Sequence, residues 1–278
     1  MLRTFPTKPY IIAQYGLQIQ LVMDSNPTKP PVLTHNTAIV VGASGGLGGG
    51  FTKVLSSEAT YQDGYGQILG FSRKPVVGQS HSRSHSNCID FADESTIAKS
   101  AALVSEICKD APLRLLIVAT GFLHANGQGP ERSLKQLDKE YLQQTMLVNT
   151  IGPALVLKHF APLLPQIGDV RLAFISAKIG SIGDNALGGW YGYRAAKAAL
   201  NQIVKTASIE LKRHNKQSIC VALHPGTVST ALSKPFSKSG LNVRSPEVAA
   251  RELLSVIHAL TPTQTGGFFD YKGDSIVW

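Results

Sequence analysis

From residue 37 to the end of the chain, short runs of apolar residues alternate with segments whose apolar residues recur at helical spacing. The apolar runs are continuous, which is typical of strands that are buried on both faces of a parallel sheet. Helices between such strands cover the two faces of that sheet. We therefore expect one doubly wound α/β domain, with ligands bound beyond the carboxyl ends of the strands.

The expected sheet has about seven parallel strands. These strands are expected at residues 37–43, 67–71, 87–90, 113–120, 170–176, 218–224 and 266–271. The first helix is expected to follow the first strand and to end near residue 58. Further helices are expected at 94–110, 134–163 and 245–260, and another in the segment that carries Tyr193. Gly152 and Pro153 interrupt the 134–163 segment, and because proline lacks an N–H donor we expect a bend there.

Length and charge limit the classes of partner. The chain has 278 residues, which is enough to bury the core of one large domain. Its 27 basic residues exceed its 18 acidic residues and give a net charge of +9, but the charges are dispersed, and the densest basic stretch is at 72–87. We expect a small anionic ligand and no nucleic acid. No apolar run approaches the length of a membrane span, so no membrane association is expected.

The cysteines and the first residues complete this outline. Cys88, Cys108 and Cys220 are scattered and lack metal-type spacing, so we expect a reduced, cytoplasmic protein without a metal site. Residues 1–36 are rich in proline and amide side chains and precede the first strand. We expect an N-terminal extension at 1–36, to which we assign no role, and a single domain at 37–278.

A glycine-rich turn follows the first expected strand. The residues are Gly42, Ala43, Ser44, Gly45, Gly46, Leu47 and Gly48. Glycine allows the backbone to turn tightly and to approach a bulky anion, and the helix that follows offers free N–H groups. The alternative is a turn that is merely flexible. Its place between the first strand and the first helix favours a phosphate-binding turn.

If the phosphate at the glycine turn belongs to a dinucleotide, the end of the second strand indicates which dinucleotide it is. An NAD site usually has a carboxylate here for the ribose hydroxyls. This chain has Ser72 and Arg73 instead, and they suit the additional 2′-phosphate of NADP. An arginine at a strand end is often only solvated, so the missing acid is part of the argument. We expect NADP(H), with NAD(H) less favoured.

Tyr193 and Lys197 are four residues apart in an alanine-rich segment without interior proline, so they share one face of a helix. Tyr191 has Ala195 at the corresponding place, and this selects Tyr193. A phenol has a pKa of about 10, and a neighbouring ammonium group would favour the tyrosinate. The pair alone is a weak signal, since a lysine stem that packs on a ring gives the same spacing.

These motifs together resemble the short-chain dehydrogenase/reductase family, over residues 37–278. The similarity rests on Gly42-x3-Gly46-x-Gly48, Tyr193-x3-Lys197, "LVNTIGP" around Asn149 and "HPGTVST" from residue 224. It implies a Rossmann fold, with Tyr193 as proton donor and Lys197 on the nicotinamide ribose. It also implies that Asn149 bends the long helix and holds a water in the proton relay.

The resemblance implies a cofactor site as well. Its members are Gly42, Ser44, Gly45, Gly46, Leu47, Gly48, Ser72, Arg73, Asp90, Ala119, Gly121, Tyr193, Lys197, Pro225, Val228 and Thr230. In this assignment Asp90 contacts the adenine, the Val228 backbone meets the carboxamide, and Thr230 meets the phosphate.

One departure from the family concerns the catalytic serine. The usual "ISSxxG" run is "ISAKIG" here, and the serine position falls on Ala177. Ser176 is our first choice for the missing hydroxyl, although neighbouring strand residues point to opposite faces. Ser181 is the second choice, and a site without a serine is the third.

Within the family, "ATGFLH", "GSIGDN" and "GGWYGYRAAKAALN" are similar to the C-factor and sniffer-type carbonyl reductase branch. The resemblance implies an NADP-dependent reductase that moves hydride between nicotinamide and a small carbonyl or alcohol, as a homodimer or homotetramer. The alternative is a dinucleotide-binding regulatory protein whose catalytic site has decayed at Ala177.

Overall fold

The computed structural model describes residues 36–57, 64–73, 88–125, 127–236 and 243–278. All of them belong to the unit Thr34–Trp278. The expected N-terminal extension and most of the basic stretch at 72–87 lie outside the described residues.

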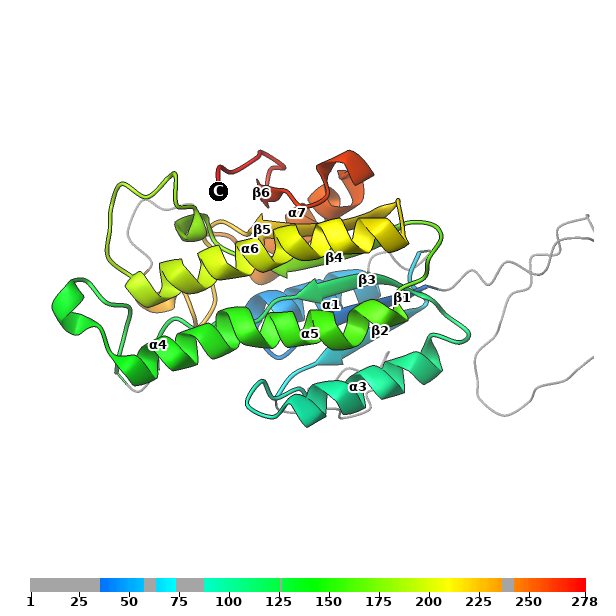
Figure 1. Cartoon of the computed structure of the whole chain (residues 1–278), viewed down its shortest axis with the longest axis horizontal. Helices are drawn as coiled ribbons and strands as arrows, with labels where there is room; N and C mark the ends of the chain where they lie inside the picture. Colours follow the sequence, from blue (N-terminus) through cyan, green and yellow to red (C-terminus); the bar gives the residue numbers. More distant parts are fainter. Residues whose placement is uncertain (1–35, 58–63, 74–87, 126, 237–242) are drawn as a thin grey trace, which may run out of the picture. The chain divides into compact units, whose positions relative to one another are not determined.

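Six parallel strands form one sheet in the order β2-β1-β3-β4-β5-β6 (Figure 1). They are β1 (Thr37–Val41), β2 (Gln67–Phe71), β3 (Leu113–Val118), β4 (Val170–Ile175), β5 (Ser218–His224) and β6 (Phe268–Asp270). The doubly wound α/β class is thus confirmed, with six strands instead of about seven. The stretch expected as a strand at 87–90 contributes one parallel bridge, between Ser72 and Cys88.

Helices cover both faces of the sheet (Figure 1). Apolar side chains of α1 (Gly46–Ser57) and α7 (Pro246–Ala259) form one core with the strands. The second core lies beneath α3 (Glu94–Ile107), α5 (Gly152–Phe160) and α6 (Tyr191–His214). Continuous apolar strands are required because each strand has side chains in both cores.

The segment expected as one helix at 134–163 is divided into several pieces. After the 3-10 turn η1 (Leu134–Gln136), α4 (Lys139–Met146) begins at Asp138, whose carboxylate accepts from the Tyr141 N–H. The π-helical turn η2 (Leu147–Ile151) then joins α4 to α5, and the 3-10 turn η3 (Ala161–Leu163) follows.

The irregular turn η2 lies just before the predicted break. Pro153 cannot donate to the carbonyl of Asn149, four residues earlier. The Gly152 N–H donates to the Leu147 carbonyl, five residues earlier, which is the π-helical pattern. The proline therefore acts on the turn that precedes it, and this turn contains Asn149.

None of the helices in the described part of the chain combines the length and the hydropathy that a membrane span requires.

Candidate active site

The glycine turn connects β1 to the start of α1 at the carboxyl edge of the sheet. Gly42 has a φ of 94°, in the region that favours glycine, and the N–H groups of Gly42 and Ala43 both donate to the Phe71 carbonyl. Ser44, Gly45 and Gly46 are exposed, whereas Leu47 and Gly48 are buried. The turn therefore presents backbone at the N-terminus of a 12-residue helix.

The segment after β5 packs directly on this turn. A Cβ atom at Gly46 would lie 2.7 Å from Cγ2 of Thr230. Pro225 is held by Arg244, whose Nη2 donates to its carbonyl at 3.0 Å, and Val228 is bridged to Arg244. The fold thus brings together two segments that are far apart in the sequence and that we expect to contact one dinucleotide.

The end of β2 lies beside the glycine turn. Ser72 is buried and Arg73 is exposed. The Arg73 carbonyl accepts from Sγ of Cys88 at 3.0 Å, and this links the end of β2 to the Cys88–Asp90 stretch. The Asp90 carboxylate accepts from the Ala92 N–H at 3.0 Å, as in an acid that forms a turn.

Asn149 joins the π turn to the loop after β3, which contains Ala119 and Gly121. Its side chain is fully buried, donates to the carbonyls of Phe122 and Thr145, and accepts from the Phe122 N–H. These bonds occupy the side-chain amide. A water bound at this residue would therefore meet its main-chain carbonyl.

Tyr193 and Lys197 lie on the buried face of α6, with relative exposures of 7% and 2%. Nζ of Lys197 is 5.7 Å from the centroid of the Tyr193 ring and donates to the Ile175 carbonyl at 2.9 Å. Tyr191 is more exposed. The structure thus brings together the two residues that helical spacing selects.

Burial dominates the electrostatics of this pair. It lowers the pKa of Lys197 from 10.5 to about 7. It also raises the pKa of Tyr193 above its ordinary value, and Tyr141 adds to this effect. In the protein itself desolvation sets the direction of the Tyr193 pKa, and the expected lowering by Lys197 together with an oxidised nicotinamide stays a prediction.

The two candidate serines differ in their hydrogen bonds, and both are buried. Oγ of Ser176 donates its single proton to Oδ1 of Asn201 at 2.6 Å. Oγ of Ser181 accepts from the Asp184 N–H at 3.1 Å. Within the described part of the chain, no acceptor takes the Ser181 proton. Ala177 lies between them in extended conformation, just before the 3-10 turn η4 (Lys178–Gly180).

Glu131 belongs to this site, and the sequence did not indicate it. Its buried carboxylate accepts from the Gly192 N–H at 3.2 and 3.1 Å, and its carbonyl accepts from the Trp190 N–H. Helix α6 has no side-chain cap at Trp190. The sequence has no capping side chain directly before α6, and this was the signal that the first N–H groups of the helix need an acceptor from another segment.

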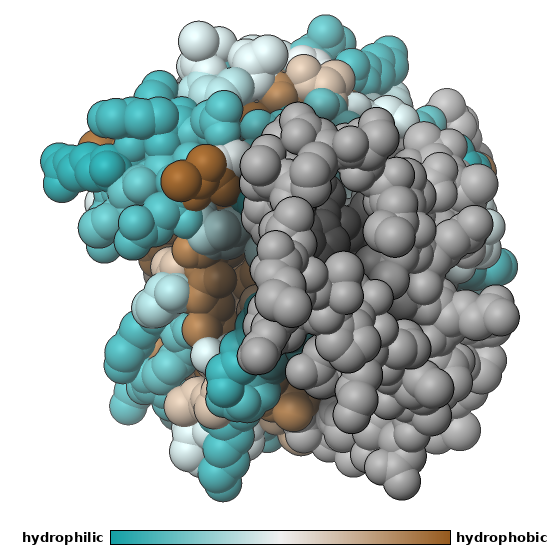
Figure 2. Space-filling view, turned by 90° about the vertical axis from the view of Figure 1, so that its right-hand side faces the viewer, coloured by the Kyte–Doolittle hydropathy of each residue, from teal (hydrophilic) through white to brown (hydrophobic). Residues whose placement is uncertain are grey.

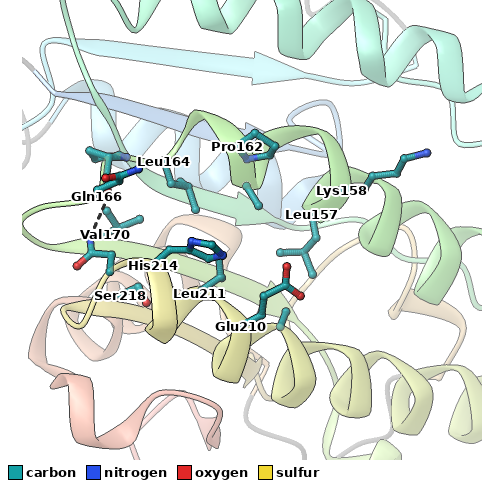
Figure 3. Close-up of a pocket in the computed structure, with 14 residues that line it drawn as sticks. Leu157, Lys158, Pro162, Leu164, Gln166, Val170, Glu210, Leu211, His214 and Ser218 are labelled. Carbon is teal, nitrogen blue, oxygen red and sulfur yellow. Dashed lines mark hydrogen bonds between the residues drawn. The ribbon is translucent and has the colours of Figure 1, made fainter.

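A cavity of about 550 Å³ lies between the ends of α5 and α6 (Figure 3). Leu157 and Leu211 line it, and it reaches Val170 and Ser218, the first residues of β4 and β5. Figure 2 faces this end of the domain and shows apolar surface among polar side chains. The cavity is at the amino edge of the sheet and is separate from the active site.

Comparison with known proteins agrees with this arrangement. The short chain dehydrogenase family profile matches residues 36–240. C-signal of Myxococcus xanthus is 34% identical over 146 residues, which cover 52% of this chain and 84% of that protein. The 1-hydroxy-2-glutathionyl-2-methyl-3-butene dehydrogenase of Rhodococcus sp. is 30% identical over 191 residues, or 68% of this chain and 78% of that protein.

Solved structures of carbonyl reductases have the same fold. NADPH-bound carbonyl reductase from chicken fatty liver has a TM-score of 0.74 and 25% identity, and the match covers 88% of this chain and 99% of that one. Carbonyl reductase Sniffer of D. melanogaster has a TM-score of 0.73 and 26% identity, over 88% of this chain and 100% of that one.

A doubly wound domain with a glycine turn after β1 and a tyrosine–lysine pair on α6 defines a dinucleotide-dependent oxidoreductase. The chain belongs to the short-chain dehydrogenase family. The expected membership is confirmed, and with it an NAD(P)-dependent oxidoreductase function; a regulatory protein with a decayed site is not favoured.

Proposed function

We propose that this protein is an NADPH-dependent reductase of small carbonyl compounds. The observation that carries the proposal is the Tyr193–Lys197 pair on α6, buried at the carboxyl edge of the sheet. The exposed backbone of the glycine turn, with Thr230 packed on Gly46, fits the pyrophosphate of a dinucleotide. The bound cofactor supplies the hydride.

Tyr193 donates a proton to the carbonyl oxygen of the substrate as hydride arrives. Its hydroxyl is a suitable acid because burial keeps the phenol protonated until the substrate oxygen gains negative charge. Lys197 then stabilises the tyrosinate, since its Nζ lies on the same buried helix face. The ammonium form is required for this role, so carbonyl reduction is expected to decline above neutral pH.

The proton of Tyr193 is replaced through Lys197 and Asn149. Because the Asn149 side chain is bound to the loop after β3, its main-chain carbonyl is the group we assign to a relay water. Pro153 supports this role, since it withholds the N–H that would bond to this carbonyl in a regular α-helix.

For the carbonyl-polarising hydroxyl we now favour Ser181 over Ser176. A group that polarises a carbonyl must donate a hydrogen bond. Ser176 already donates to Asn201, whereas Ser181 acts only as an acceptor in its bond to Asp184. The substitution at Ala177 is therefore compatible with an active enzyme.

We assign the cofactor preference to Ser72 and Arg73, with Asp90 on the adenine. The exposed guanidinium of Arg73 is available to a 2′-phosphate, and no carboxylate stands at the end of β2. The NADPH-bound carbonyl reductase from chicken fatty liver supports the same preference.

We further propose that α5 and α6 form the contact of a homodimer or homotetramer. Ile151 before α5 and Ile209 on α6 are 46% and 51% exposed, and such a contact would cover both side chains. A cytoplasmic location is proposed from the three free cysteines.

The test is turnover of a panel of carbonyl compounds with NADPH, followed at the nicotinamide absorbance. Tyr193→Phe is expected to lower turnover by about 10² or more while NADPH still binds, since it removes only the general acid. Tyr191→Phe is the matched control and is expected to have little effect. Equal losses in the two variants would refute the assignment of Tyr193.

A further inference from the structure

Three partly exposed rings form a row of contacts that begins at Tyr193. The Trp190 indole meets the Tyr193 ring edge-on, with centroids 6.3 Å apart, and meets the Phe236 ring with centroids 5.1 Å apart. The His124 imidazole lies 5.6 Å from Phe236. We call Trp190, Phe236 and His124 the aromatic wall. All three are of intermediate exposure, so they present ring surface beside the proposed proton donor.

The aromatic wall is assembled from three separate segments. Trp190 directly precedes α6, His124 lies in the loop after β3, and Phe236 ends the 3-10 turn η5 (Lys234–Phe236). The His124 ring nitrogen Nε2 lies 3.2 Å from the Ala231 carbonyl, and this contact ties the loop after β3 to the segment that carries Phe236. Tertiary contacts therefore hold the rings together.

The backbone at Trp190 is strained in a way that directs its side chain. Trp190 has a φ of 55°, and among the described residues other than glycine no other φ is positive. A bulky side chain rarely occupies this region, and such strain persists only where the surroundings impose it. One contact in these surroundings is the Glu131 carbonyl, which accepts from the Trp190 N–H. A fixed indole beside Tyr193 is thus a built feature of the site.

We propose that the aromatic wall selects carbonyl substrates that carry an aryl ring; this inference rests on the proposed reductase function. Aromatic rings attract one another through edge-to-face contacts, which favour binding by a factor of about three to ten beyond area burial. A saturated ring buries similar apolar area but lacks this attraction. An aryl group on Trp190 and Phe236 would leave the carbonyl of the same molecule at Tyr193.

The experiment compares hydrocinnamaldehyde with its ring-saturated counterpart, cyclohexylpropanal. Two methylene groups separate ring and carbonyl in both aldehydes, so their intrinsic reactivity is matched. We expect kcat/KM with NADPH to be about fivefold higher for the aryl aldehyde, mainly through a lower KM. An apolar pocket without ring recognition would treat the two alike or favour the saturated ring.

Trp190→Leu keeps an apolar side chain and the backbone strain but removes the ring. It is expected to bring the ratio of the two kcat/KM values close to one, and this ratio is the readout because a general loss of activity lowers both values together. Tyr191→Leu makes the same chemical change one residue away and is expected to keep the wild-type ratio. A wild-type ratio near one, or a ratio that survives in Trp190→Leu, would overturn the proposal.

Binding of the two product alcohols in the presence of NADP⁺ separates this inference from the proposed function. Hydrocinnamyl alcohol is expected to bind about fivefold tighter than cyclohexylpropanol to the wild type and no tighter to Trp190→Leu. This preference without turnover of any aldehyde would refute the reductase function and keep the aromatic wall as an aryl site. Turnover of the aldehydes without this binding preference would refute the aryl site and keep the reductase function.

Discussion

At the scale of single residues, the pKa of Lys197 shows how strongly burial in the active site disfavours the ammonium form of this side chain. Burial lowers its pKa from 10.5 to about 7. Between these values the unfolded chain binds one more proton than the folded chain, so stability rises with pH across this window. Below pH 7 both states hold the proton, and the cost of burying the ammonium is present in full.

Lys197→Met should therefore raise the melting temperature most at acidic pH. We expect the difference between variant and wild type to be clearly larger at pH 6 than at pH 9, because the wild type buries an ammonium group only at the lower pH. The variant lacks the bond to the Ile175 carbonyl at both pH values. Thermal unfolding at the two pH values measures this difference. A pH-independent difference would show that the lysine is not buried as a charge. Lys109→Met, an exposed residue, is the control.

Ser181 and Ser176 allow a comparison of two buried hydroxyl groups. Ser181→Ala should lower kcat by about 10², the loss seen when one oxyanion donor is removed. Ser176→Ala should reduce stability, since the buried Oδ1 of Asn201 loses its donor, and should affect kcat less. Steady-state kinetics and thermal melts of both variants decide the assignment. A larger kcat loss in Ser176→Ala would show that Ser176 is the carbonyl-polarising hydroxyl. A wild type without activity that gains activity through Ala177→Ser would favour a decayed site.

At the scale of elements, the start of α6 depends on a residue from a distant loop. Glu131 replaces the missing cap by accepting from the Gly192 N–H, one residue before Tyr193. A carboxylate at a helix N-terminus also interacts favourably with the helix dipole. The position of the proposed proton donor is therefore coupled to Glu131.

Glu131→Ala should lower both stability and turnover. The buried Gly192 N–H would lose its acceptor, at a cost of about 1–3 kcal/mol, and Tyr193 would be less well placed. Glu131→Gln keeps an acceptor oxygen and should restore most of the kcat, while NADPH affinity changes little in either variant. Kinetics and cofactor titration measure these effects, with exposed Glu140→Ala as control. Full activity in Glu131→Ala would show that the contact is dispensable.

At the scale of the whole domain, we expect cofactor binding to be coupled to folding, because the proposed dinucleotide site joins segments from both halves of the sheet. Saturating NADPH should raise the melting temperature more than NADH at equal concentration. A tenfold affinity difference is worth about 1.4 kcal/mol, or about 2–6 °C for a domain of this size. Arg73→Ala should remove this difference. A greater shift with NADH would refute the NADP preference.

Local patterns in the sequence determined the sheet architecture of this protein and the central pair of its proposed active site. Continuous apolar runs placed the strands and the two-sided sheet, because an element's own side chains decide whether it can be buried. The glycine turn lies between β1 and α1, and Tyr193 and Lys197 lie within α6, so both features belong to contiguous stretches of sequence. For this reason the family and the central pair could be recognised before the structure.

Contacts between distant segments were decided only by the tertiary structure. Glu131 and Gly192 are 61 residues apart, and Ser176 and Asn201 are 25 apart, so no local pattern reports that they meet. The raised pKa of Tyr193 likewise results from desolvation by packed neighbours, to which Tyr141 adds. Hydrogen bonding and burial depend on which surfaces face each other after folding, and periodicity along the chain does not encode this.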